Sequence, residues 1–216
     1  MREIFITGGT GYIGRPLITE LLARGHILRA LVRGGSEGKL PTGVTTVFGN
    51  ALDASSFASA VPPADSFVHL IGTPRPNPTK AQQFRKIDLV SVKAAVAAAI
   101  SASVQHIVYV SVAQPAPTMR AYVNVRAEGE ALIRASRLNA TILRPWYVLG
   151  QRHRWPYLLM PVYALLKQLP ATRASALRLG LITLPQMLAA LVRAVEQPAE
   201  GVRIVEVPEI CSGPDA

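Results

Sequence analysis

The stretch Glu3-Ile-Phe-Ile-Thr-Gly-Gly-Thr-Gly-Tyr-Ile-Gly14 places a short apolar run directly before three evenly spaced glycines. The run predicts a buried strand, and the apolar residues that recur from Ile13 onward predict a helix. The glycines allow a tight turn, a close approach of backbone to a pyrophosphate and close packing of helix on strand. We interpret the stretch as a dinucleotide-binding turn rather than an empty structural loop. The contacts are expected from Gly8, Thr10, Gly11, Tyr12, Ile13 and Gly14.

Composition indicates an ordinary globular protein. The chain has 216 residues, half of them hydrophobic, which suits one domain with a sizeable core. No amino-terminal signal peptide and no membrane-spanning run is expected. Cys211 is the single cysteine and cannot form an internal disulfide, so we expect a reducing, cytoplasmic location.

The chain is strongly basic, with a formal net charge of +10. The excess is concentrated in residues 118–178, which hold ten arginines or lysines against Glu128 and Glu130. Such a field favours an anionic cofactor, an acidic substrate or an anionic membrane surface, or is simply a solvated basic face. We expect no nucleic-acid partner, because the arginines are dispersed among apolar residues without a recognised binding motif.

The second expected strand, residues 27–33, ends in an arginine. In dinucleotide folds the end of this strand meets the adenosine ribose, where an acid suits NAD and an arginine accommodates the 2′-phosphate of NADP. Arg33 follows Gly14 by the required distance of roughly 20 residues. We therefore predict NADP as the cofactor in preference to NAD, with Arg33 and Ser36 near the 2′-phosphate. The alternative is a solvated arginine at a strand end.

Strands and helices alternate along the whole chain. Further strands are expected at 44–48, 66–72, 106–111, from 139 and at 202–207, with helices ending near 25 and 60 and spanning about 79–102, about 120–137 and a segment after Thr183. The alternation predicts an α/β fold, a doubly wound parallel (Rossmann) sheet with helices on both faces. We expect one domain, 1–216, in which 151–182 is a small capping insertion on the substrate side.

The fourth expected strand ends beside the cofactor. Gly72 would let backbone come close to the dinucleotide, together with Leu70 and Ile71. The proline-rich segment 74–78 should be an extended loop bordering the active site, at the strand end where ligands bind in such sheets. His69 lies inside the apolar run and is interpreted as a packed histidine. We expect no metal site, because no cluster of histidines and cysteines has ligand spacing.

The glycine spacing Gly8-x-x-Gly11-x-x-Gly14 resembles that of the extended and atypical short-chain dehydrogenases/reductases, and of the NmrA-like NAD(P)-binding proteins among them. Arg144-Pro145 matches a pattern common after the sixth strand in these families. The resemblance extends over nearly the whole chain. It implies that the turn Asn50, Ala51 and Leu52 contacts adenine, although asparagine stands where the family has aspartate. Asn50 shaping only the turn is the alternative.

The resemblance also implies catalytic residues. Tyr122 and Arg126 match the family's Tyr-x-x-x-Lys, in which lysine binds the nicotinamide ribose and lowers the pKa of the tyrosine. Arginine keeps the charge but has different hydrogen-bond geometry. Tyr122 is thus a proton donor, a pocket wall or a packing residue. Ser111 matches the position of the family's active-site serine, and Val112 is the alternative match to that position. Asp88, where relatives often have asparagine, is expected to be a surface residue.

Two function classes follow. The first is an NADP-binding oxidoreductase that transfers hydride to or from a small carbonyl or quinone-like substrate. The second is a non-catalytic NADP-binding redox sensor or assembly factor, as the resemblance to NmrA-like sensors implies. The basic and apolar segment 152–169 is expected to be buried in the substrate-side subdomain, or to meet substrate, a partner or a membrane surface peripherally. The sequence leaves the oligomeric state open.

Overall fold

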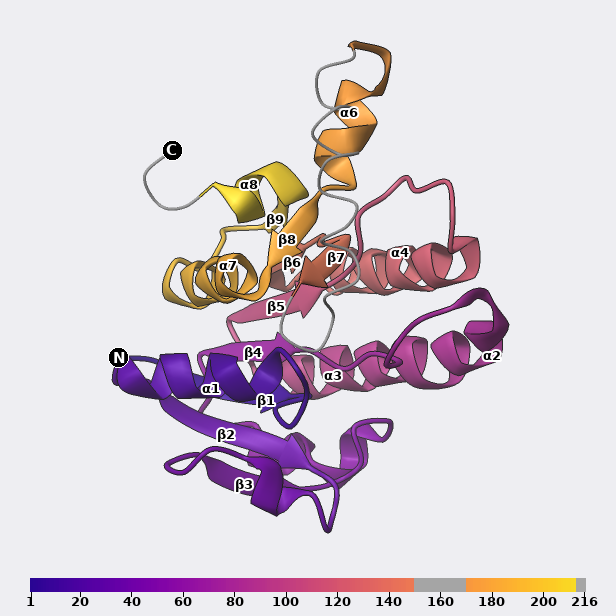
Figure 1. The fold of residues 1–216 in the computed structure, drawn as a ribbon. Coiled ribbons are helices and arrows are strands. Elements are labelled where there is room, and N and C mark those ends of the chain that lie inside the picture. Colours follow the sequence, from indigo (N-terminus) through magenta and orange to yellow (C-terminus); the bar gives the residue numbers. More distant parts are fainter. Residues whose placement is uncertain (150–169, 213–216) are drawn as a thin grey trace.

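The computed structural model describes residues 1–149 and 170–212 (Figure 1). Their main feature is a seven-stranded sheet in the order β3-β2-β1-β4-β5-β6-β9, in which every neighbouring pair is parallel. The strands are β1 (Glu3–Thr7), β2 (Ile27–Val32), β3 (Thr45–Phe48), β4 (Ser66–His69), β5 (His106–Val110), β6 (Asn139–Leu143) and β9 (Val202–Val205). The predicted doubly wound α/β fold is therefore confirmed.

The strands read as continuous apolar runs because both faces of the sheet are covered. In β1 the side chains alternate between two separate clusters: Phe5 packs with Phe57 and Phe67 on one face, while Ile4 and Ile6 pack on the other. All five residues are at most 1% exposed. The sheet therefore has a hydrophobic core on each side, as expected for a parallel sheet between helical layers.

Helices form a layer on each face (Figure 1). One layer contains α1 (Gly14–Ala23) and α7 (Leu184–Glu196), which touch each other and pack on the face that holds Ile4. The other contains α3 (Val90–Ser101) and α4 (Arg120–Ala135), which pack on the face that holds Phe5. The strand order reverses between β1 and β4, and ligands of such sheets bind at the carboxyl ends of the strands at this point.

The predicted helix at 79–102 is irregular. A 3₁₀ turn (Pro78–Lys80) and the short α2 (Ala81–Gln83) lead into a π-helical stretch (Phe84–Leu89), and only then does α3 begin. π-Helical turns are rare in proteins, and those that occur are often found at functional sites. This one contains Asp88. Between β3 and β4 the expected short helix is two separate 3₁₀ turns, Ala54–Ser56 and Ala58–Ala60.

Near the carboxyl end the structure adds elements that the sequence did not reveal. The segment after β6 forms β7 (Tyr147–Leu149), which pairs in parallel with β8 (Leu181–Thr183) in a two-stranded sheet. Helix α6 (Pro170–Arg178) precedes β8, and α8 (Val207–Cys211) follows β9. Thr183 caps α7 in a capping box with Gln186, which confirms the predicted helix start. The expectations for 152–169 lie outside the described residues.

Candidate functional site

A cavity of about 1250 Å³ lies where the carboxyl ends of β1 and β4 meet. The glycine turn after β1 forms one part of its wall, and the loop after β4 forms another. Side chains of α4 and the junction between β8 and α7 complete it. The cavity thus occupies the switch point of the sheet, where the topology predicts a ligand site.

Two positions of the glycine turn, Gly8 and Gly14, have no room for a side chain. Gly8 has a φ of +79°, and a Cβ built on it would lie 2.9 Å from the carbonyl carbon of Leu70 on the neighbouring strand. A Cβ on Gly14 would collide with the carbonyl oxygen of Gly8. The turn is closed by the bond from the Gly11 amide to the Gly8 carbonyl oxygen, 3.0 Å. Only glycine satisfies these approaches, as the sequence motif predicted.

The start of α1 suits an anion. Its N-cap, Ile13, provides no side-chain hydrogen bond to the first turn. The Arg15 amide donates to the Gly11 carbonyl at 3.2 Å and Pro16 has no amide proton, so among the described residues the Gly14 amide is the first-turn donor left for another acceptor. Backbone amides and the helix dipole at such a position bind phosphate groups. The residues present therefore fit the pyrophosphate of a dinucleotide, and Gly8, Gly11 and Gly14 provide the close backbone approach that it needs.

The other predicted cofactor residues divide into two groups. Within the first, Thr10, Tyr12, Leu70 and Gly72 line the cavity with the glycines. Those outside its lining are Arg33, Ser36, Asn50, Ala51, Leu52 and Ile71. The first five of these follow β2 and β3, which neighbour β1 in the sheet. Cofactor contacts from the second group stay predictions.

Two members of that second group have contrasting surroundings. Asn50 is engaged in its own turn: its Oδ1 accepts from the Leu52 amide at 3.1 Å, and its backbone carbonyl accepts from the Ser56 hydroxyl at 3.1 Å. Arg33 is exposed, and its guanidinium has no hydrogen-bond or ion-pair partner within residues 1–149 and 170–212. Arg33 is therefore available to a ligand, whereas Asn50 already has a structural role.

Tyr122 and Arg126 lie on one face of α4 and both line the cavity. The Arg126 guanidinium carbon lies 5.2 Å from the centroid of the Tyr122 ring, and Phe84 packs on the same ring at 5.1 Å. Tyr122 is half-buried, whereas Arg126 is 5% exposed. The helical spacing of four residues thus brings the two predicted side chains together, as expected.

Arg126 is held by an ion pair with a second buried residue. Its Nη2 lies 2.8 Å from Oδ1 of Asp88, and its Nη1 donates to the Val110 carbonyl at 3.0 Å. Oδ2 of Asp88 accepts from the amide and the hydroxyl of Thr73, at 3.0 and 2.5 Å. The expectation that Asp88 is a surface residue was wrong: it is 1% exposed.

The pKa of Arg126 is raised above its ordinary value, so this residue is always charged. Burial by itself lowers the pKa, but Tyr122, Tyr109 and Asp88 around the guanidinium outweigh that effect. Sequence reasoning missed the partnership with Asp88, because the π-helical turn that carries Asp88 does not show in the local pattern. The sequence did contain one signal for this pair: Arg126 stands where the family has lysine, and Asp88 stands where relatives often have asparagine.

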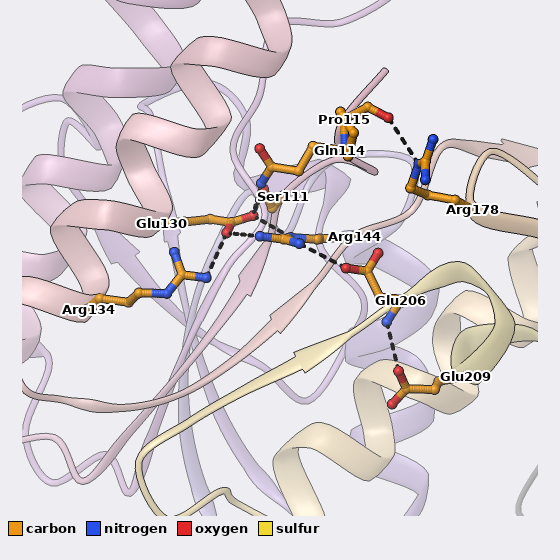
Figure 2. A network of polar contacts seen from close by, with 9 residues as sticks. All are labelled: Ser111, Gln114, Pro115, Glu130, Arg134, Arg144, Arg178, Glu206 and Glu209. Atoms are coloured by element: carbon orange, nitrogen blue, oxygen red, sulfur yellow. Dashed lines mark hydrogen bonds and ion pairs between the residues drawn. The ribbon is translucent and has the colours of Figure 1, made fainter. Parts of the chain in front are cut away.

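Ser111 belongs to a different polar network (Figure 2). It is 3% exposed and lies outside the cavity lining. Its hydroxyl donates to Oε1 of Glu130 at 2.6 Å, and Gln114 donates to the same oxygen at 2.7 Å. Arg144 holds Glu130 with two bonds, Nε to Oε1 at 2.9 Å and Nη2 to Oε2 at 2.6 Å. The Arg144-Pro145 motif therefore has a structural explanation.

The network keeps Glu130 ionised. Burial raises the pKa of this carboxyl, but hydrogen bonds from Arg144 and Ser111 and the charges of Arg144 and Arg134 bring it below its ordinary value. An ionised carboxylate only accepts hydrogen bonds, so the Ser111 proton is directed at Glu130. Ser111 as a catalytic residue stays a prediction.

His69 is a packed histidine, as predicted. Its Nδ1 lies 2.8 Å from the Thr7 hydroxyl and its Nε2 3.3 Å from the Ser91 hydroxyl. Burial, with a smaller contribution from the Arg126 charge, lowers the pKa of His69 to about 3, so the ring is neutral at ordinary pH. It is part of the sheet's packing rather than of the cavity wall.

The part of the chain that the structure describes also bears on metal binding and membrane insertion. Within it, no group of three or more histidine, cysteine, aspartate or glutamate residues could hold a metal ion. None of the helices described there combines the length and the apolar character that crossing a membrane requires.

Comparison with known proteins adds to this geometry. A family model described as NAD(P)H-binding matches residues 8–174. A ketoreductase of Stigmatella aurantiaca, named for 4-hydroxy-2-methyl-3-oxo-4-farnesyl-3,4-dihydroquinoline-1-oxide, is 30% identical over 109 residues, which are 50% of this chain and 32% of the relative. A 3-beta-hydroxysteroid dehydrogenase of Mycolicibacterium neoaurum is 31% identical over 113 residues, 50% of this chain and 31% of the relative. Each match thus spans about a third of the curated relative.

Solved structures share the fold. The enzyme WbmH of Bordetella bronchiseptica, solved in complex with NAD+, superposes with a TM-score of 0.71 at 21% identity, covering 95% of this chain and 76% of that chain. A likeness at this identity concerns the arrangement of sheet and helices.

Proposed function

Because this chain belongs to the NAD(P)H-binding family, among the atypical short-chain dehydrogenases/reductases, we propose that it binds NADP and transfers hydride to or from a small carbonyl or quinone-like substrate. The observation that carries the proposal is the shared cavity. It joins the glycine turn, which fits a pyrophosphate, to Tyr122 and Arg126, which are suited to proton transfer and charge stabilisation.

The chain's own residues have separable roles in this proposal. The glycine turn and the start of α1 hold the dinucleotide, whose nicotinamide supplies or accepts the hydride when bound. Tyr122 gives a proton to the substrate oxygen, or takes one from it, at its Oη. Arg126, fixed by Asp88, stabilises negative charge that develops on Oη, because its guanidinium is already in place. The apolar lining, including Leu149 and Leu184, favours a substrate with apolar surface.

Preference for NADP rests on Arg33. Its guanidinium, exposed and without a partner among the described residues, can hold a 2′-phosphate, whereas the ribose hydroxyl of NAD offers no charge to match. A hydrogen bond to a charged group is worth about 1.5 to 3 kcal/mol, which corresponds to about a ten- to hundredfold preference. Arg33→Asp should reverse the preference by repelling the phosphate. Titrations with NADPH and NADH, at two salt concentrations, test this, and equal wild-type affinities would reject it.

The reaction is tested by screening the purified protein with NADPH against carbonyls and quinones. With a substrate found, Tyr122→Phe should lower turnover at least about tenfold and leave NADPH affinity nearly unchanged, because proton transfer contributes about 10² to 10⁴ in rate. Ser111→Ala should lower turnover by less. Full turnover in the Tyr122→Phe variant would exclude Tyr122 as the proton donor.

A non-catalytic NADP-binding sensor or assembly factor is the second candidate. It is favoured by two contacts. The Ser111 hydroxyl donates to Glu130, and Arg126, which stands where the family has lysine, is paired with Asp88. Both side chains thus have structural partners. Tight NADPH binding without turnover across the screen, together with a cofactor-dependent complex in pull-downs, would favour this candidate over the enzyme.

We propose a single domain in which 151–182 caps the substrate side, and a cytoplasmic location in keeping with the single cysteine. Residues 181–183 form β8, and Thr183 lines the cavity, which supports a substrate-side position for the end of this insertion.

A further inference from the structure

The charges that line the cavity are all of one sign. Arg15, Arg75 and Arg126 line it, and none of the described aspartate or glutamate residues does. A cavity with walls of one charge sign concentrates ions of the opposite sign. The lining alone therefore favours an anion.

One of the three arginines is already neutralised. Arg126 pairs with Asp88 at 2.8 Å, and its Nη1 also donates to the Val110 carbonyl at 3.0 Å and the Ile71 carbonyl at 3.4 Å. The pair carries no net charge, so Arg126 adds little to the field at the mouth of the cavity. The uncompensated charge rests on Arg15 and Arg75.

In the part of the chain that the structure describes, these two arginines have no acidic partner. Both are exposed, and within residues 1–149 and 170–212 neither guanidinium has a hydrogen bond or an ion pair. The segment 150–169 contains no aspartate or glutamate, so it offers no carboxylate side chain to either. The charge that lines the cavity is thus left for a ligand.

The backbone of Arg75 is held in place before any ligand binds. Its φ is +49°, in the left-handed region that is uncommon for residues other than glycine. Lys80 fixes this conformation, since its Nζ donates to the carbonyls of Pro74 at 2.7 Å and Arg75 at 3.1 Å. Such conformations gather at ligand-binding positions, where the surrounding structure maintains them.

We propose that Arg75, with Arg15, forms an oxyanion-recognition position of this cavity, which binds a phosphate or diphosphate group. The position is distinct from Arg33 and deepens the proposed function, on whose dinucleotide binding it rests. Two sources have this chemistry, namely the pyrophosphate of the cofactor and an anionic group on the substrate. Either group would be met by a cation on the cavity wall.

Inorganic pyrophosphate is the probe for the test. Isothermal titration of the free protein should show binding that Arg75→Gln and Arg15→Gln each weaken about tenfold, the lower end of what a hydrogen bond to a charged group is worth. Arg137→Gln is the matched control: Arg137 is an exposed arginine with a φ of +60°, and it lies outside the cavity lining. It should change pyrophosphate affinity less than twofold.

Repeating the titration with NADPH-saturated protein separates the two sources. The position belongs to the cofactor if NADPH saturation abolishes pyrophosphate binding and the Arg75→Gln variant also binds NADPH more weakly. Binding that persists at the same affinity, and still needs Arg75, assigns it to a substrate anion.

The proposal is overturned if Arg75→Gln loses no more affinity for pyrophosphate than Arg137→Gln does in the free protein. Failure of the proposed function is a separate result, seen as wild-type protein that does not bind NADPH. A pyrophosphate site that depends on Arg75 would stand in that case as well.

Discussion

The two sides of the cavity are built by different means. On the side of β1 and α1 the wall is backbone: Gly8, Gly11 and Gly14 bring main-chain atoms to the cavity, and one backbone hydrogen bond of 3.0 Å closes the turn. On the side of α4 the wall is made of side chains, with Arg126 fixed by Asp88 from a segment 38 residues earlier. The first wall depends on glycines that have no side chain, whereas the second wall depends on a buried pair of opposite charges.

The difference shows where each wall is vulnerable. Adding a methyl group to the glycine turn removes space that a ligand needs, whereas removing a carboxylate from the other wall leaves a buried cation without its partner. Mutations in the first wall should therefore affect binding more than folding. Those in the second should affect folding first.

The largest effect is expected for Asp88→Ala. The variant leaves the Arg126 charge buried and the Thr73 amide without its acceptor, and breaking a buried pair in this way costs about 3 to 5 kcal/mol. Urea unfolding measures the free energy. Asp88→Asn, which keeps the volume and an acceptor oxygen, should lose less.

Glu128→Ala is the control for that loss. It breaks the pair with Arg85, whose side chains are 62% and 44% exposed, and should cost less than about 1 kcal/mol. Similar losses for the two variants would contradict the importance that we assign to burial of the Asp88 pair.

The next largest effect is expected for Gly14→Val, on binding. Its Cβ would meet the Gly8 carbonyl oxygen, which opens the turn and removes amide donors from the phosphates. Loss of two such bonds, each about 1.5 to 3 kcal/mol, weakens NADPH binding by about a hundredfold or more. Fluorescence titration measures it. Gly38→Ala is the control, since a Cβ there meets nothing within 4 Å.

A smaller effect is expected for Gly72→Ala, where the two walls meet. Its Cβ would collide with the Arg126 guanidinium, and overpacking of this kind costs about 1 to 3 kcal/mol. The cost should shrink in an Asp88→Ala background, because Arg126 is then free to move. If the losses of unfolding free energy add in the double variant, the Asp88 pair does not restrict the movement of Arg126 away from residue 72, and this prediction is wrong.

The smallest effect concerns pH. His69, buried near Arg126, has a pKa of about 3 when folded and about 6.5 when unfolded. Below pH 6.5 the His69 ring takes up a proton in the unfolded chain but stays neutral in the folded protein. The unfolding free energy therefore falls as pH falls, by up to about 1.4 kcal/mol per pH unit for this group.

Urea unfolding at several values between pH 7.5 and 5 measures this slope, and His69→Gln should flatten it. His106, whose pKa is lowered to about 4 by burial and by the charges of Arg203 and Arg2, contributes a similar slope and serves as the comparison. An unchanged slope in the His69→Gln variant would mean that the folded ring takes up a proton after all.

Much of the fold was predictable because its signals are local. The glycine turn spans seven residues, and the atoms that a side chain on Gly8, Gly11 or Gly14 would meet belong to the turn itself or to the segment that follows the adjacent strand. Apolar runs and helical spacing likewise gave the strands of the main sheet and the start of α7 at Thr183. The β7–β8 pair was not predictable, since its three-residue strands are about 30 residues apart and too short for a periodic pattern.

The sequence by itself determined the doubly wound sheet, the glycine turn and the positions of Tyr122 and Arg126 on one helix face. Only the tertiary structure decided which charges face the cavity. Asp88 pairs with Arg126 across 38 residues and Glu130 binds Ser111 across 19, and neither pairing has a local pattern. Backbone conformation follows from neighbouring residues, whereas the partner of a buried charge is fixed by which segments the sheet brings together.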